Sequence, residues 1–184
     1  MAAERRTVVV LDDDPTGTQT CTGCRCSPDG RRRHRRELSS RPPALFLLTN
    51  SRSLDPARAA EINTRTGRQI RAAAESVRSR VVVVSRGDST LRGHFPDETM
   101  ALADGLGGGF DGVLLVPAFI EGGRVTVDGR HWVADADGWT PVGRTPYARD
   151  ATFGFGSSDL PDWVAERSGG RIPREAVQLL TLRE

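Results

Sequence analysis

The segment VVVLDDDPTGTQT, residues 8–20, decides the fold class of this 184-residue chain. Its apolar part belongs to the β-branched run Thr7–Leu11, and three aspartates and a Pro-Thr-Gly turn follow directly. A short apolar run that ends in turn residues predicts a strand buried in a parallel sheet. The polar residues then lie at the carboxyl end of that strand, which is where open α/β sheets bind their ligands.

Further apolar runs repeat this arrangement along the chain. Each predicts a strand that ends in polar or turn residues, and the runs are Ala44–Leu48, Val81–Val84 and Val113–Val116. One helix is predicted to open at Asp55-Pro56, with the aspartate as N-cap, and another near Pro96. Strands that alternate with helices indicate an α/β fold with a mostly parallel sheet and helices on both faces.

The pattern changes in the C-terminal third of the chain. Arg124–Val127 and Arg130–Val133 flank Asp128-Gly129, which predicts a β-hairpin with a type I′ turn. A helix is predicted from Ser157 or Ser158 to about residue 167, and a last strand at Ala176–Leu182. We therefore expect residues 1–184 to form one domain with a C-terminal β-hairpin region.

Composition and charge exclude several classes of function. Every basic residue is arginine, so a complete P-loop is excluded, because its lysine contacts the nucleotide phosphates. The net charge of +2 gives no reason to expect a polyanion such as nucleic acid as a partner. The apolar runs are too short to span a bilayer, and no signal peptide is visible at the N-terminus, so we expect a cytoplasmic protein without a membrane partner.

Residues 21–43 form an atypical segment rich in arginine and cysteine. Cys21, Cys24 and Cys26 with His34 are an irregular set of zinc ligands, so we expect no metal there. The basic run Arg31–Arg36 has no interleaved aromatic residues on which bases would stack, and we predict a solvated loop. A locally shifted reading frame is a further hypothesis for this composition, and resequencing of the gene tests it.

The polar clusters at the predicted strand ends are the candidates for chemistry. The richest are Asp12–Thr20 and Ser85–His94, which the fold class would bring to one edge of the sheet. Carboxylates accept hydrogen bonds from ligand hydroxyls and can take a proton as general base. Guanidinium groups bind a ligand carboxylate with two parallel hydrogen bonds. The clusters therefore predict a site for a small, negatively charged ligand rich in hydroxyls.

Five segments of the sequence together resemble one known family. They are VVVLDDDPTGTQT (Val8–Thr20), LLTNSRSL (Leu47–Leu54), VVSRGDSTLRGHFPDE (Val83–Glu98), DGVLLVPAFIEGGR (Asp111–Arg124) and RDATFGFGSSDL (Arg149–Leu160). With them the chain resembles the four-carbon acid sugar kinase family, specifically its N-terminal sugar-acid-binding domain. The third segment is the most specific, and only Cys21–Pro43 departs from the family pattern.

The resemblance implies a kinase that uses ATP to phosphorylate threonate, erythronate or oxo-tetronate type acids. The family's N-terminal half binds the acid, and a C-terminal half binds ATP and Mg²⁺, so the nucleotide site is expected outside this chain, in a further domain or a separate subunit. The family's paired aspartates fall on Asp13 and Asp14, either of which would accept the proton of the attacking hydroxyl. The implied acid-binding set, with no metal, is Asp13, Asp14, Arg86, Asp88, Ser89 and Arg92. We expect this chain alone to bind the acid weakly and to show no kinase turnover.

Two alternative functions remain open at this point. A haloacid-dehalogenase-like, Mg²⁺-dependent phosphatase would use Asp12 as nucleophile and Asp14 as acid, with Gly87-Asp88-Ser89 near the metal. That interpretation lacks the family's lysine and leaves the Leu91-Arg92-Gly93 block unexplained. The other alternative is a non-catalytic sugar-acid-binding module or subunit, which the sequence does not separate from the acid-binding part of a kinase.

Overall fold

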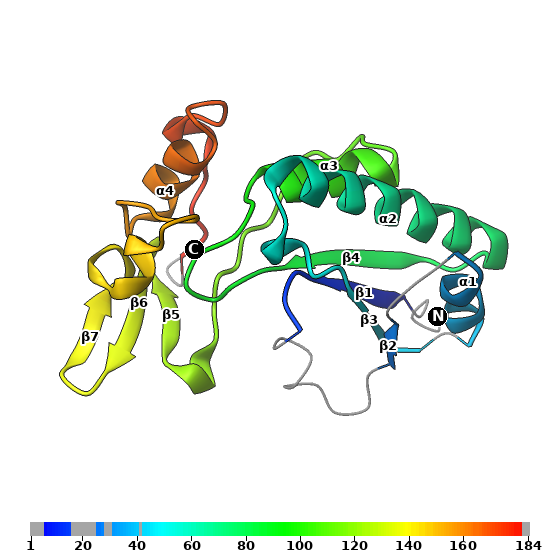
Figure 1. Cartoon of the computed structure of the whole chain (residues 1–184), viewed down its shortest axis with the longest axis horizontal. Coiled ribbons are helices and arrows are strands. Elements are labelled where there is room, and N and C mark those ends of the chain that lie inside the picture. Colours follow the sequence, from blue (N-terminus) through cyan, green and yellow to red (C-terminus); the bar gives the residue numbers. More distant parts are fainter. Residues whose placement is uncertain (1–5, 16–24, 28–30, 41, 182–184) are drawn as a thin grey trace. The chain divides into compact units, whose positions relative to one another are not determined.

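The computed structural model describes residues 6–15, 25–27, 31–40 and 42–181 of the chain (Figure 1). The chain divides into two compact units, of which the first comprises Met1–Gly87 and Asp97–Asp111 and the second Asp88–Pro96 and Gly112–Glu184. The backbone therefore passes from one unit to the other at residues 87–88, 96–97 and 111–112. That residues 1–184 act as one domain stays a prediction.

A parallel sheet of four strands forms the centre of the first unit. The strands are β1 (Thr7–Asp12), β2 (Arg25–Ser27), β3 (Ala44–Leu48) and β4 (Val81–Arg86), in the order β2-β3-β1-β4. In the register of the central strand, Asp12 lies beside Leu48 on one side and beside Arg86 on the other. The polar ends of three strands therefore share one edge, as the sequence predicts.

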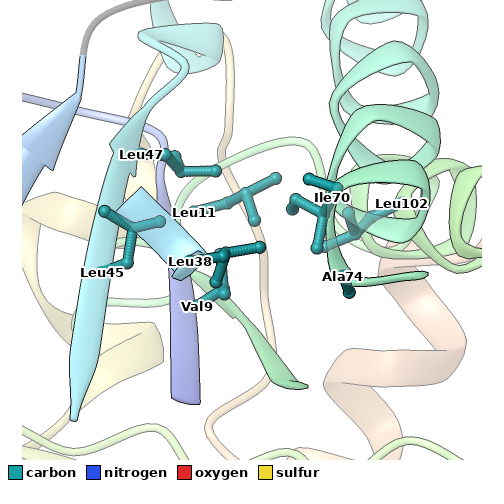
Figure 2. Packing of buried hydrophobic residues seen from close by; sticks show 9 residues of the cluster. Val9, Leu11, Leu38, Leu45, Leu47, Ile70, Ala74 and Leu102 are labelled. Carbon is teal, nitrogen blue, oxygen red and sulfur yellow. The ribbon is translucent and has the colours of Figure 1, made fainter. Parts of the chain in front are cut away.

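Three helices cover one face of this sheet. They are α1 (Arg31–Ser39), α2 (Pro56–Val77) and α3 (Asp97–Leu106), and Figure 1 shows α2 and α3 lying over the strands. In Figure 2, Val9 and Leu11 of β1 point toward Ile70 and Ala74 of α2 in one shared apolar core. The α/β class and the parallel sheet are confirmed.

The expected covering of both sheet faces is not found among the described residues. Leu38 of α1, Ile70 of α2 and Leu102 of α3 all belong to the core on the same face. Side chains alternate along β4, so Val81 and Val83 pack against this core, whereas Val82 and Val84 point away and are 41% and 40% exposed. The sequence of four consecutive valines does not indicate which face of the sheet the helices cover, because the positions on both faces are apolar.

Helix α1 corrects the prediction of a solvated loop within residues 21–43. Arginine has a high helix propensity, and Leu38 is buried against the sheet while Arg35 and Arg36 remain exposed. One buried leucine therefore gives this basic segment an apolar contact that composition alone does not reveal. The zinc question depends on Cys21 and Cys24, which lie outside the described residues.

Helices α2 and α3 approach each other closely at two glycines. A Cβ atom placed on Gly67 would lie 2.8 Å from the carbonyl oxygen of Leu102, and one on Gly105 would lie closer still to the carbonyl oxygen of Thr64. These neighbours are backbone atoms, which do not move aside as a flexible side chain would. The contact between the two helices therefore requires glycine at both positions.

The second unit contains an antiparallel sheet of three strands and one helix. The strands are β5 (Arg124–Val127), β6 (Arg130–Asp135) and β7 (Gly138–Pro141), and the helix is α4 (Leu160–Arg167). Asp128 and Gly129 adopt left-handed backbone conformations with φ of 47° and 78°, so the predicted hairpin is confirmed. Asp159 caps α4, rather than Ser157 or Ser158, and the strand β7 was not predicted. Short 3-10 turns cover Ser51–Ser53, Ile120–Gly122, Val142–Arg144, Pro146–Arg149 and Arg174–Ala176.

Two predicted strands are wrong. Residues 112–118 form no strand, and Val113, Leu114 and Val116 are 57%, 76% and 70% exposed. An apolar run becomes a strand only where another strand pairs with its backbone, and no strand among the described residues pairs with this run. Residues 177–181 of the other predicted strand also have no regular structure. Among the described helices, none is long and apolar enough to cross a membrane.

Candidate functional site

The first of the three strand-end aspartates is buried and paired. The side chain of Asp12 has no exposed surface, and Arg86 Nη1 donates a hydrogen bond to its Oδ2 at 3.0 Å. Burial raises the pKa of Asp12, and the Arg86 guanidinium opposes this effect. A phosphatase nucleophile must reach its substrate, so this burial argues against the role of Asp12 in the phosphatase interpretation.

The second aspartate is held by an arginine that the sequence did not identify. Arg52 donates from Nε to Asp13 Oδ2 at 2.9 Å and from Nη2 to Oδ1 at 2.6 Å. Its third nitrogen, Nη1, lies 3.6 Å from Asp14 Oδ2. The side chain of Asp13 is 4% exposed and that of Asp14 is 28% exposed, so Asp14 is the more accessible of the two carboxylates. The sequence feature that indicates a role for Arg52 is its position directly after β3, at the predicted edge of the sheet.

Hydroxyl groups after β3 connect the sheet edge to α3. Thr49 donates from Oγ1 to the carbonyl oxygen of Asp12 at 2.9 Å, and its Oγ1 lies 3.0 Å from Ser51 Oγ. Ser51 in turn donates to Oε1 of the buried Glu98 at 2.7 Å. These contacts tie the backbone that follows β1 and β3 to helix α3.

In the second unit, a compact loop surrounds Arg92. Arg92 Nε donates to Asp88 Oδ2 at 2.7 Å, and the Thr90 hydroxyl hydrogen-bonds the same carboxylate oxygen. Arg92 Nη1 reaches Asp150 Oδ2 at 3.5 Å, and the guanidinium carbon lies 5.1 Å from the centre of the Tyr147 ring. Backbone N–H groups of Phe153 and Thr152 lower the pKa of Asp150, with a smaller effect of Arg92. Two carboxylates therefore balance the charge of Arg92.

The backbone of Ser89 is fixed by a buried histidine that sequence reasoning missed. His131 on β6 is fully buried, and its Nε2 lies 2.8 Å from the carbonyl oxygen of Ser89. A carbonyl oxygen only accepts hydrogen bonds, so Nε2 carries the proton. Burial lowers the pKa of His131, which favours the neutral ring, and Nδ1 lies 2.9 Å from Thr126 Oγ1. Nothing in the alternating pattern of the hairpin distinguishes this histidine from a packing residue.

Comparison with protein families assigns the chain. The model of the sugar-binding N-terminal domain family matches residues 8–183. This chain belongs to that family. The predicted resemblance to the sugar-acid-binding domain of four-carbon acid sugar kinases is thereby confirmed. A search of the curated proteins gives no match.

A solved structure supports the assignment to the sugar-binding family. It is the crystal structure of a domain of unknown function, DUF1537, from Bordetella bronchiseptica, described as a domain-swapped dimer with bound citrate. The two chains are 26% identical with a TM-score of 0.65, over 86% of this chain. The match covers 39% of the Bordetella chain, so this sugar-binding domain corresponds to a minor part of that protein's length.

The six residues predicted to contact the ligand of this sugar-binding domain fall into two groups. Asp13, Asp14 and Arg86 belong to the first unit, where the sheet register brings them to one edge. Asp88, Ser89 and Arg92 belong to the second unit, where one loop holds them. That all six act on one ligand stays a prediction.

Proposed function

We propose that this domain binds a four-carbon acid sugar of the threonate, erythronate or oxo-tetronate type, which an ATP-dependent kinase phosphorylates. The observation that carries the proposal is the match of residues 8–183 to the sugar-binding N-terminal domain family. Citrate, bound in the Bordetella structure, is itself a small carboxylic acid with a hydroxyl group. A ligand of this chemistry suits the guanidinium and carboxylate groups found in both units.

We assign the roles of the proposed contact residues from their burial. The side chains of Arg86 and Arg92 are 37% and 29% exposed, while salt bridges fix their orientation. Asp13 is committed to Arg52, whereas Asp14 is the more exposed aspartate. We therefore propose Asp14 as the base that takes the proton of the attacking hydroxyl, and Asp13 as the group that holds Arg52 in place.

In the proposed enzyme, the nucleotide binds to a part other than this domain. ATP with Mg²⁺ would supply the phosphoryl group, and a site for it needs cationic groups around the phosphates. The chain contains no lysine, so it does not fit the P-loop arrangement, in which a lysine contacts the phosphates. We propose that a separate nucleotide-binding part completes the kinase, and that this chain alone hydrolyses no ATP in response to the acid.

Two measurements test the proposed function. Thermal shift assays of the chain with threonate and erythronate should raise the unfolding temperature, and Asp14→Asn and Arg92→Gln should reduce the shift. Arg68→Gln, a change at an exposed position on α2, is the matched control and should leave the shift unchanged. A coupled ATPase assay of the chain alone should show no acid-dependent activity. Robust activity in that assay would refute the proposal that a separate part binds the nucleotide. If the acid shifts the unfolding temperature but no kinase activity appears after the nucleotide-binding part is added, a non-catalytic module is favoured.

A further inference from the structure

Of the five arginines in the family segments, three pair with a carboxylate, whereas the partly buried Arg124 and the exposed Arg149 have no such partner among the described residues. Arg52 pairs with Asp13, Arg86 with Asp12, and Arg92 with Asp88. Arg124, the last residue of the segment DGVLLVPAFIEGGR, has no carboxylate within 4.0 Å among the described residues. A partly buried guanidinium without an anion is unfavourable, because its charge loses hydration without an opposite charge in return.

The surroundings of Arg124 hold its side chain in place while leaving its charge unbalanced. Its Nη2 donates to the Tyr147 hydroxyl at 3.2 Å, and its Nη1 donates to the carbonyl oxygen of Gly122. Its Nε is buried and has no hydrogen-bond partner in the part of the chain that the structure describes. The guanidinium carbon lies 5.9 Å from the ring centres of both Phe119 and Tyr147. All of these partners are neutral.

The two glycines before Arg124 allow its guanidinium to lie close to the backbone and to the Phe119 ring. A Cβ atom on Gly122 would lie 2.7 Å from Arg124 Nη1 and closer still to the Phe119 ring, so a side chain at this position would displace one of these two groups. Gly123 has a φ of 69°, in the left-handed region that favours glycine. The two glycines therefore leave space for the Arg124 guanidinium to pack against the Gly122 carbonyl group and the Phe119 ring.

Tyr147 connects this guanidinium to the loop of the proposed site. The Arg92 guanidinium carbon lies 5.1 Å from the Tyr147 ring centre and that of Arg124 lies 5.9 Å from it, so both cations lie against one ring. Asp88 and Asp150 balance the charge of Arg92, but no carboxylate in the described part of the chain balances that of Arg124. An anion bound beside Tyr147 would supply the missing charge.

We propose that Arg124 binds the carboxylate of the acid sugar and that Tyr147 orients its guanidinium. This inference rests on the proposed function and identifies the group by which the domain distinguishes an acid from a neutral polyol. Arg92 then remains available for ligand hydroxyls, because its own charge is already balanced. A planar guanidinium recognises a carboxylate through paired hydrogen bonds, so lysine would replace it only in part.

Calorimetric titration with three ligands tests the role of Arg124. The ligands are threonate, its uncharged amide and citrate, and the proteins are the wild-type chain, Arg124→Gln, Arg124→Lys and Arg130→Gln. We expect the wild-type chain to prefer threonate over the amide by at least about tenfold, Arg124→Gln to lose this preference, and Arg124→Lys to keep part of it. Arg130, an exposed arginine over the Trp132 ring, is the matched control and should behave as wild type.

The outcomes separate this inference from the proposed function. Preservation of the wild-type preference in Arg124→Gln, with unchanged affinity for citrate, would overturn the role of Arg124 and leave the sugar-acid function standing. Absence of binding of every acid to the folded wild-type chain would overturn both. Tryptophan fluorescence confirms that the variants are folded, because Trp132, Trp139 and Trp163 all lie in the same unit as Arg124.

Discussion

Replacement of His131 tests how the second unit fixes the backbone of Ser89. His131 is fully buried, contacts Thr126 Oγ1 through Nδ1 and donates from Nε2 to the Ser89 carbonyl oxygen. His131→Ala removes both hydrogen bonds, each worth about 0.5–1.5 kcal/mol, and leaves a cavity and an unpaired carbonyl. We expect the free energy of unfolding to fall by about 2–4 kcal/mol in total. His131→Gln retains an N–H donor and should lose about half of that.

The same histidine makes stability depend on pH. The pKa of His131 is lower in the folded chain than in the unfolded chain. At a pH between these two values, the unfolded chain therefore binds more protons than the folded chain. Stability therefore declines as the pH falls below about 6.5, the ordinary pKa of histidine, and each whole unit by which the pKa is lowered contributes about 1.4 kcal/mol. At pH 8 both states carry the neutral ring, and this contribution is absent.

Urea unfolding followed by tryptophan fluorescence measures both effects. All three tryptophans lie in the second unit, and Trp163 is buried and stacked on Phe95, so the signal reports this unit. Unfolding curves from pH 8 to pH 5 should show a steeper loss of stability for the wild-type chain than for His131→Gln. Arg144→Gln, at an exposed position of the same unit, is the control, because it keeps His131 and should keep the wild-type slope. Equal slopes for wild type and His131→Gln would refute the reasoning.

Two further predictions concern the first unit. Gly105→Ala should lower the unfolding temperature measured by far-ultraviolet circular dichroism and cost about 1–3 kcal/mol, because the new Cβ meets the Thr64 backbone. Arg68→Ala, at an exposed position on α2, is the control and should melt as the wild-type chain does, and equal melting of the two variants would contradict the close helix contact. Arg52→Lys should weaken threonate binding several-fold in calorimetry, because a lysine cannot replace the two parallel hydrogen bonds to Asp13, and unchanged affinity would show that this pairing does not organise the site.

The parts of the fold that follow from local pattern could be predicted from the sequence. Apolar runs with polar ends identified β1, β3 and β4, and Asp128-Gly129 identified the hairpin, because strand burial and turn geometry depend on neighbouring residues. The run Val113–Val116 has the same pattern but forms no strand, since a strand also needs a partner that the run itself does not specify. Helix α1 was missed for the opposite reason, because a single buried leucine stabilises a segment that is otherwise polar.

The sequence indicates where charged side chains gather at the sheet edge, but not which of them pair. The strand ends indicated where carboxylates and guanidinium groups gather, and the register of β1 with β4 brings Asp12 and Arg86 together. The partners Arg52 and His131, and the unbalanced charge of Arg124, depend on contacts between segments far apart in the chain. Only three-dimensional packing decides which of several arginines pairs with a carboxylate.

The most direct measurement is a calorimetric titration of the wild-type chain with threonate and erythronate beside threitol and erythritol, their uncharged four-carbon counterparts. The sugar-acid function predicts a saturable heat of binding for at least one acid and much weaker binding of both polyols. A folded chain that gives no heat with any of the acids, or that binds polyols and acids equally, would contradict it.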